Sequence, residues 1–118
     1  MINIKRIYEE ATTDDGVRIL VDRLWPRGIS RDKAKLNSWN KEISPSPDLR
    51  KWVNHDAAKY EEFKDRYIAE LNNNPESAAF KEMINKKQEE GPVTLLYAAK
   101  DQEHNNAVVL KEWLLSDH

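Results

Sequence analysis

The chain has 118 residues, enough for one domain with its own hydrophobic core and without a metal or disulfide to hold it together. Nineteen basic and twenty-one acidic residues give a net charge of −2, which excludes an overall positive field that would attract nucleic acid. The lack of cysteine excludes disulfides, a thiolate nucleophile and cysteine-ligated metals, and it fits a reducing compartment.

Apolar runs and glycines are both too few for several further classes of protein. No apolar run reaches membrane length, and the first ten residues contain no signal-peptide core. The three glycines, Gly16, Gly28 and Gly91, form neither a GxGxxG motif nor a Walker-type phosphate loop. We therefore predict a single cytoplasmic domain over residues 1–118, with no cofactor, no membrane partner and no nucleic acid partner.

The first third of the chain predicts two strands and a short helix. Ile2, Ile4 and Ile7 recur as in a half-buried strand, and the turn cluster at 12–16 then indicates a hairpin or an edge strand. Residues 17–21 are apolar apart from Arg18, which is typical of an interior strand covered on both faces. Ser30 is expected to cap a short helix over 31–35, whereas 36–43 fits no single element.

The rest of the chain predicts helices around a second apolar strand. Ser46 as N-cap and Pro47 at the first helical position start one helix, and Asp56 is expected to cap the next. Asn74-Pro75 opens a third helix that Gly91-Pro92 ends. The apolar run 93–98 is a strand, and Asn105 or Asn106 caps a last helix.

Strands separated by helices predict an α/β fold, a three-layer sandwich with a small, mainly parallel sheet flanked by helices. Ligands bind to such sheets in the crevice beyond the carboxyl ends of the strands. Two unusual loops, DRLWPRG at 22–28 and AKDQEHNN at 99–106, each follow one of the two apolar strands. If these strands are parallel neighbours, both loops lie at the same edge of the sheet.

The loop DRLWPRG is rich in charge for a simple turn. The proline favours an extended Trp25, and Gly28 can adopt a backbone conformation that other residues avoid. Arg23 and Arg27 have forked donors that suit a carboxylate or a phosphate. The alternative is that these arginines pair with Asp22 or a helix acid while Trp25 packs in the core.

The loop AKDQEHNN places polar residues at a strand-to-helix turn, where free amides of the last helix would attract anions. Lys100, Asp101, Asn105 and Asn106 are candidate ligand-binding residues, and His104 is placed to act as an acid or base near neutral pH. The alternative is that Asp101 and the asparagines make local turn and capping bonds while His104 is solvated.

The remaining histidine and tryptophan residues are assigned mainly to structure. His55 and Asp56 have no other histidine at metal-ligand spacing, so we predict no metal site. Asp56 fits a helix cap, and His55 is assigned to the neighbourhood of the anion site. Trp39, Trp52 and Trp113 are expected in the core rather than on a stacking platform.

Three stretches that span nearly the whole chain carry a family resemblance. They are GVRILVDRLWPRGISRDKAKL, LRKWVNHDAAKYEEFKDRY and VTLLYAAKDQEHNNAVVLKEWL. Together they resemble the YeaO-like group within family 488 of the domains of unknown function. The resemblance implies a compact α/β domain and supplies no reaction.

Other branches of that family look like LLCAEKDPEHCHR at the corresponding strand and turn, a pattern suited to thiol or phosphate chemistry. Here Tyr97 replaces the first cysteine, Asn105 the second, and Asn106-Ala107 the His-Arg pair. The lysine, aspartate and histidine of the turn are kept. A thiolate mechanism is therefore excluded, and the resemblance favours ligand binding over a shared reaction.

The preferred interpretation is a domain that binds a small anionic molecule at the carboxyl edge of its sheet, with hydrolase or transferase chemistry left open. Basic side chains would hold the anion, and Asp22 and Asp101 would orient them or accept a proton. The candidate catalytic residues are His104 and Asp22, and the candidate ligand-binding residues are Arg23, Trp25, Arg27, His55, Lys100, Asp101, Asn105 and Asn106. The alternative is a non-catalytic protein-interaction or regulatory module anchored on an exposed tryptophan edge. The sequence leaves the oligomeric state open.

Overall fold

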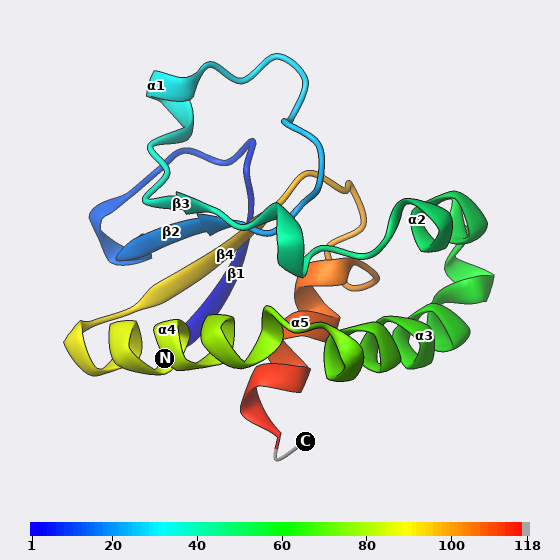
Figure 1. Ribbon diagram of the computed structural model, residues 1–118. Coiled ribbons are helices and arrows are strands. Elements are labelled where there is room, and N and C mark those ends of the chain that lie inside the picture. Colours follow the sequence, from blue (N-terminus) through cyan, green and yellow to red (C-terminus); the bar gives the residue numbers. More distant parts are fainter. Residues whose placement is uncertain (117–118) are drawn as a thin grey trace.

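The computed structural model describes residues 1–116, in which four strands form one sheet with every neighbouring pair parallel (Figure 1). In spatial order the strands are β1 (Ile2–Arg6), β4 (Val93–Tyr97), β2 (Val17–Leu20) and β3 (Ser38–Trp39). The predicted α/β class is confirmed. Of the two alternatives for the first strand, the edge strand is correct and the hairpin is wrong, because β1 pairs with β4 and not with β2. The two residues of β3 lie in the stretch that the sequence left unassigned.

The helices are α1 (Arg31–Ala34), α2 (Pro47–Val53), α3 (Tyr60–Asn73), α4 (Ser77–Glu90) and α5 (Asn106–Leu115), with short 3-10 helices at Thr13–Asp15, Lys41–Ile43 and Ala57–Lys59. The helices α1, α2 and α5 begin directly after their predicted caps, whereas α3 begins after a 3-10 helix that Asp56 caps, and α4 begins at Ser77 and not at Asn74-Pro75. The predicted cap side chains of Ser30, Ser46, Asp56 and Asn105 each accept a backbone N–H of the following turn. Such caps satisfy amides that have no partner within the helix.

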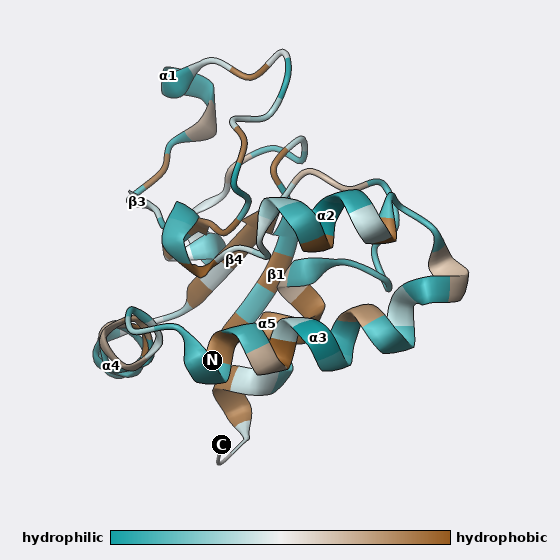
Figure 2. Ribbon diagram, turned by 45° about the vertical axis from the view of Figure 1, so that its right-hand side comes forward, coloured by the Kyte–Doolittle hydropathy of each residue, from teal (hydrophilic) through white to brown (hydrophobic). Residues whose placement is uncertain are grey.

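The two faces of the sheet are covered very unequally. On the face that we call the helical face, α2 to α5 bury a large core that includes Ile19, Tyr67, Leu95 and Leu110. The opposite face, which we call the loop face, is covered by α1 and the irregular chain around it, and its buried cluster is Ile7, Leu20, Ala34 and Leu96. Figure 1 shows α1 on the far side of the sheet from α3, α4 and α5, and Figure 2 shows how much of the hydrophobic colour lies on α5 and the strands. The predicted three-layer sandwich is therefore present, with one thin outer layer.

The loop face also buries ionised groups, which the sequence analysis did not predict. Arg18 of β2 is 4% exposed, and its guanidinium donates to the Asp15 carboxylate at 2.6 Å and to the Ala34 carbonyl at 2.8 and 3.1 Å. Lys5 of β1 donates to the same carboxylate at 3.0 Å. Burial by itself would raise the pKa of Asp15, but hydrogen bonds from Thr12, Lys5 and Arg18 lower it to about 2. A charged residue in an otherwise apolar strand is thus paired inside the protein.

The turn that leads into β2 depends on a glycine. Gly16 has φ +63°, and a Cβ atom at this position would lie 2.1 Å from the Pro92 carbonyl oxygen. Val17 donates its N–H to that same oxygen at 3.0 Å, so the starts of β2 and β4 are held together here. In the described part of the chain, no helix has the length and hydropathy needed to cross a membrane.

Candidate functional site

The two loops singled out from the sequence meet at the carboxyl edge of the sheet. β2 and β4 are parallel neighbours, so both loops leave the sheet at the same end. The Asp22 carboxylate accepts the Ala98 N–H at 2.9 Å and the Asn106 side-chain amide at 3.1 Å. The same Asn106 amide donates to the Val21 carbonyl at 3.1 Å. The predicted meeting of the loops is confirmed, and Asp22 and Asn106 make the direct contact.

Asp22 is a partly buried carboxylate without an ion pair in residues 1–116. Burial raises its pKa, while the hydrogen bonds from Ala98 and Asn106 and the positive charges of Arg50 and His55 act to lower it. Both carboxylate oxygens are already engaged by donors of the protein. Arg50 comes from α2 and His55 from the turn after it, so residues of a third segment also influence the charge of Asp22.

The backbone at His55 is held in an unusual conformation. Asn54 has φ +40° and His55 has φ +58°, so two consecutive residues other than glycine lie in the left-handed region. Such conformations cost free energy and persist where the surrounding structure imposes them, often at functional sites. His55 itself is exposed. The strain fixes the turn that carries His55 toward the edge of the sheet.

The turn between β4 and α5 makes the local bonds that the sequence analysis weighed as an alternative. Asp101 accepts the N–H groups of Glu103 and His104 at 2.9 and 3.0 Å and lies 2.9 Å from His104 Nδ1. These hydrogen bonds lower the pKa of Asp101. Asn105 accepts the Val108 N–H at 3.0 Å and donates to the Asp101 carbonyl at 2.9 Å. The amides that an external anion would use are therefore partly taken by the protein itself.

His104 is exposed, and its ring packs edge-on against Tyr60 at the start of α3, with 4.8 Å between the ring centroids. Burial raises the pKa of Tyr60 to about 12, helped by the charges of Glu112, Glu61 and Asp101. Asp101 holds His104 Nδ1, and in the described residues Nε2 has no hydrogen-bond partner. The arrangement orients an imidazole toward solvent next to a tyrosine that stays protonated near neutral pH.

The loop DRLWPRG divides between two places. Arg23 donates over 3.3 and 3.4 Å to the carbonyls of Pro45 and Ser44, just before α2. Trp25 instead packs on the loop face, with its Nε1 bonded to the Ile29 carbonyl at 2.7 Å, so the alternative of packing holds for Trp25. Arg27 is exposed, and its carbonyl accepts the Tyr8 hydroxyl. No hydrogen bond or ion pair within residues 1–116 joins the side chains of Trp25 or Arg27 to the turn after β4, although Trp25 and Ala98 pack against the same buried cluster.

Tyr97 and Asn105, the positions where other branches of the family have cysteine, have structural roles in this protein. Tyr97 is 2% exposed and packs in the core of the helical face, and Asn105 caps α5. Among residues 1–116, no group of three or more histidine and acidic side chains is placed to hold a metal ion. Asp56 caps the 3-10 helix before α3, as predicted. The three remaining tryptophans, Trp39, Trp52 and Trp113, pack against the hydrophobic clusters as expected.

Sequence reasoning missed Arg50 and Tyr60. Arg50 lies on a short helix that the sequence does predict, but only the packing of α2 shows that its charge reaches Asp22. Tyr60 is the first residue of α3, and the structure shows its contact with His104. No local motif identifies either residue. Lys100 is exposed, and its side chain makes no hydrogen bond or ion pair in the described part of the chain.

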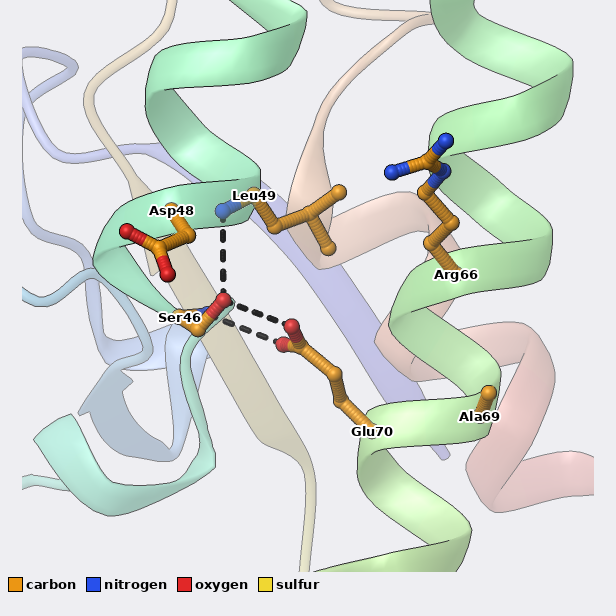
Figure 3. A pocket seen from close by; sticks show the side chains of 6 residues that line it. All are labelled: Ser46, Asp48, Leu49, Arg66, Ala69 and Glu70. Carbon is orange, nitrogen blue, oxygen red and sulfur yellow. Dashed lines mark hydrogen bonds between the residues drawn. The ribbon is translucent and has the colours of Figure 1, made fainter.

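A hollow of about 370 Å³ lies elsewhere, between the start of α2 and α3 (Figure 3). Glu70 accepts the Ser46 N–H at 2.9 Å and the Ser46 hydroxyl at 2.6 Å across its floor. Asp48 and Arg66 are also at its wall. None of the residues predicted for the site lines it, and its carboxylate at Glu70 is already bonded, so we do not assign it a ligand.

Comparisons with known proteins agree with the resemblance seen in the sequence. The chain is 46% identical over 115 residues to an uncharacterized protein YeaO of Escherichia coli strain K12, covering 98% of this chain and 97% of that one. It is 37% identical over 113 residues to the uncharacterized proteins Mb3100c of Mycobacterium bovis and Rv3073c of Mycobacterium tuberculosis, covering 96% of this chain and 92% of each relative. No solved structure matches it. A family model described as the inactive DUF488-N3 subclade matches residues 1–118, and the chain therefore belongs to that family.

Proposed function

We propose that this protein is a non-catalytic domain that binds a small anionic molecule at the carboxyl edge of its sheet, between the end of β2 and the turn after α2. The observation that carries the proposal is that both oxygens of Asp22 are bonded within the protein, while the side chains of Arg50 and His55, which help to lower the pKa of Asp22, make no hydrogen bond or ion pair within residues 1–116. Their own donors remain free to bind a further anion.

The cations assigned to this edge have few partners within the protein. The side chains of Arg50, His55 and Lys100 make no hydrogen bond or ion pair within residues 1–116, and Arg23 makes only long bonds to two carbonyls. The two acids of the candidate site are satisfied by the protein, Asp22 by Ala98 and Asn106 and Asp101 by its own turn. An anion placed here would meet unpaired cations and few competing carboxylates.

The side chains around His104 favour binding without turnover. The described residues beside His104 include Tyr60, whose pKa of about 12 makes it a weak nucleophile near neutral pH. Asn105, where other branches have cysteine, is a helix cap. Membership in a subclade described as inactive points the same way. We therefore assign His104 and Asp22 no catalytic step and keep them as parts of the binding edge.

Isothermal titration with inorganic phosphate and with pyrophosphate tests the binding. We expect Arg50→Gln to lower the affinity about tenfold, which corresponds to about 1.4 kcal/mol. Lys51→Gln is the matched control, since Lys51 is the next exposed cation of α2 and does not act on Asp22. Equal losses in both variants would show a diffuse charge effect, and a wild-type protein that binds neither anion at millimolar concentration would refute the proposal.

Turnover is tested separately with p-nitrophenyl phosphate. We expect the wild type and His104→Gln to release p-nitrophenol at the same background rate. A rate above background that falls in His104→Gln would contradict the non-catalytic assignment and leave the binding result intact.

A further inference from the structure

The loop face presents a row of cations and aromatic rings that the proposed binding edge does not use. We call this row the cation–aromatic surface, and its members are Tyr8, Trp25, Arg27, Arg31, Trp39 and Lys41. Tyr8 bonds to the Arg27 carbonyl at 2.9 Å, and the rings of Trp25 and Trp39 meet edge-on with 5.3 Å between centroids. These contacts bring together the turn after β1, the loop that follows β2, and strand β3.

The cations of this surface are held in place without being neutralised. The Arg31 guanidinium lies 4.1 Å from the Trp25 ring centroid and 5.4 Å from that of Trp39, and Lys41 Nζ lies 4.4 Å from the Trp39 centroid. Within residues 1–116, the side chains of Arg27, Arg31 and Lys41 form no ion pair and donate no hydrogen bond. Stacking on an aromatic ring restricts a guanidinium but leaves its in-plane N–H donors free. Arg31 is thus pre-organised to bind a carboxylate.

Positive charge is concentrated in the segment that covers the loop face. Residues 22–41 contain six Lys and Arg against two Asp, a net charge of +4, whereas the whole chain has −2, which leaves −6 for the rest. The acids within the segment are Asp22, bonded at the sheet edge, and Asp32 on α1. The segment that covers the loop face therefore carries a local positive charge on an acidic protein.

Two exposed apolar side chains belong to the same segments, Leu24 next to Trp25 in the chain and Tyr8 bonded to the Arg27 carbonyl. Leu24 is 59% exposed and Tyr8 is 41% exposed, and both belong to the small group of exposed large apolar residues of the described chain. Trp25, by contrast, is partly buried with its Nε1 bonded to Ile29, so it supports the surface rather than anchoring a partner. Arginine and aromatic residues beside apolar ones are typical of the centre of protein interfaces.

We infer that the cation–aromatic surface docks an acidic segment of a partner protein, whose carboxylates bind Arg27, Arg31 and Lys41 and whose apolar side chains pack on Leu24 and Tyr8. A nucleic acid strand fits less well, because Arg31 and Lys41 lie over the tryptophan rings on which bases would stack. A long polyanion would also run onto the acidic remainder of the surface. The inference concerns a different surface from the anion site at the carboxyl edge.

Fluorescence anisotropy with a labelled synthetic peptide rich in Glu and Asp and containing leucines tests the inference. We expect the wild type to bind this peptide, to bind its Gln and Asn counterpart at least tenfold more weakly, and to lose affinity as salt rises. Arg31→Gln is expected to weaken binding of the acidic peptide about tenfold. Arg50→Gln is expected to leave it unchanged, which separates this result from the test of the anion site.

Arg66→Gln is the matched control. Arg66 also stacks on a tryptophan, with 4.4 Å to the Trp52 centroid, but it is paired with Glu62 at 2.5 Å. We expect it to keep the affinity of the wild type for the acidic peptide. Arg31→Lys keeps the positive charge but lacks the forked guanidinium donors, and we expect it to bind the acidic peptide more tightly than Arg31→Gln does. This variant also shows whether the loss in Arg31→Gln comes from a folding defect. The inference is overturned if the peptide and its neutral counterpart bind equally, if Arg31→Gln binds like the wild type, or if a single-stranded oligonucleotide of equal charge binds more tightly than the peptide.

Discussion

The helical face and the loop face of the sheet differ in how their surface cations are paired. On the helical face, three cations of α3 and α4 are paired with glutamates of the same or a neighbouring helix, namely Lys64 with Glu112, Arg66 with Glu62 and Lys87 with Glu90. On the loop face, Arg27, Arg31 and Lys41 stay unpaired at the surface, while Arg18 and Asp15 are paired inside. The difference shows that glutamates pair several cations of the long helices α3 and α4, whereas the cations around α1 on the loop face have no acidic partner within residues 1–116.

The same contrast holds for the interior. Four helices bring a continuous set of apolar side chains to the helical face. The loop face has only α1 and irregular chain, and its buried apolar cluster is correspondingly small. Polar groups fill the remaining space there, with Thr94 donating to the Asp15 carbonyl at 2.7 Å and Arg18 bonded to Ala34. One face is held mainly by apolar packing and the other by packing together with buried hydrogen bonds.

Two neighbouring leucines of β4 give the largest expected effect and the sharpest test of this contrast. Leu95 and Leu96 are both 0% exposed, and they point to the helical face and the loop face respectively. We expect Leu95→Ala to lower the free energy of unfolding by about 3 to 5 kcal/mol and Leu96→Ala by about 2 to 3, because irregular chain relaxes more readily around a cavity. Urea unfolding of the two variants measures the difference. Equal losses would contradict the unequal packing of the two faces.

Removal of the buried carboxylate on the loop face is expected to have the next largest effect. Asp15→Asn should lower the free energy of unfolding at neutral pH by about 2 to 3 kcal/mol, because it leaves Arg18 buried beside a weaker partner. The pKa of Asp15 is lowered from 3.8 to about 2 in the folded protein, so its stabilising contribution is complete above about pH 4 and is lost as the pH falls toward 2.

Unfolding by urea across this acidic range tests the assignment. The stability of the wild type should fall more steeply than that of Asp15→Asn. Asp14→Asn is the matched control, since Asp14 is the exposed neighbour in the same 3-10 helix, and it should follow the wild type. A wild type and an Asp15→Asn variant with parallel pH profiles would show that Asp15 contributes nothing through its charge.

The cap of α5 is expected to have a smaller effect. Asn105→Ala removes the acceptor for the Val108 N–H and the bond to the Asp101 carbonyl, and we expect a loss of about 1 kcal/mol. Thermal unfolding should show this as a decrease in Tm of about 4 °C or more. Asn105→Asp keeps a cap acceptor and should retain most of the stability. A Tm of Asn105→Ala equal to that of the wild type would mean that the cap is replaced by water.

The smallest expected effect on stability belongs to Arg31, whose role we assign to binding. Arg31→Gln loses stacking on two tryptophans at an exposed site, and we expect a decrease of at most about 1 kcal/mol in the free energy of unfolding. Arg66→Gln should change stability by a similar amount. A loss above about 2 kcal/mol in Arg31→Gln would identify it as a structural cation of the loop face and not as a docking residue.

Much of the fold was predictable because its signals are local. Serine, aspartate and asparagine caps fix where α1, α2 and α5 begin, since the side chain that caps a helix lies within three residues of the amide it binds. The continuous apolar runs of β2 and β4 predict interior strands of a parallel sheet, and that arrangement alone brings DRLWPRG and AKDQEHNN to one edge. The two-residue β3 was missed because so short an element has no periodicity.

The candidate site was predictable only in part. Asp22 and Asn106 meet as expected, and His104 lies beside Asp101, because their positions follow from strand order and from a local turn. Trp25 and Arg27 belong to another surface, since the loop after β2 turns toward the loop face after Arg23. That direction depends on contacts with Tyr8 and Trp39, which are distant in the chain.

Local signals in the sequence were enough to predict the α/β class, the starts of α1, α2 and α5, the common edge of the two loops and the exclusion of thiol chemistry. Three features could be seen only in the folded chain. Arg50 and His55 help to lower the pKa of Asp22, Arg18 is paired with Asp15 inside the loop face, and Arg31 lies over the rings of Trp25 and Trp39. The physical reason is the distance along the chain over which each kind of interaction acts. Caps and strand patterns act over a few residues, whereas the protonation of a carboxylate and the pairing of a cation depend on whichever charges and rings the folded chain brings within a few ångströms.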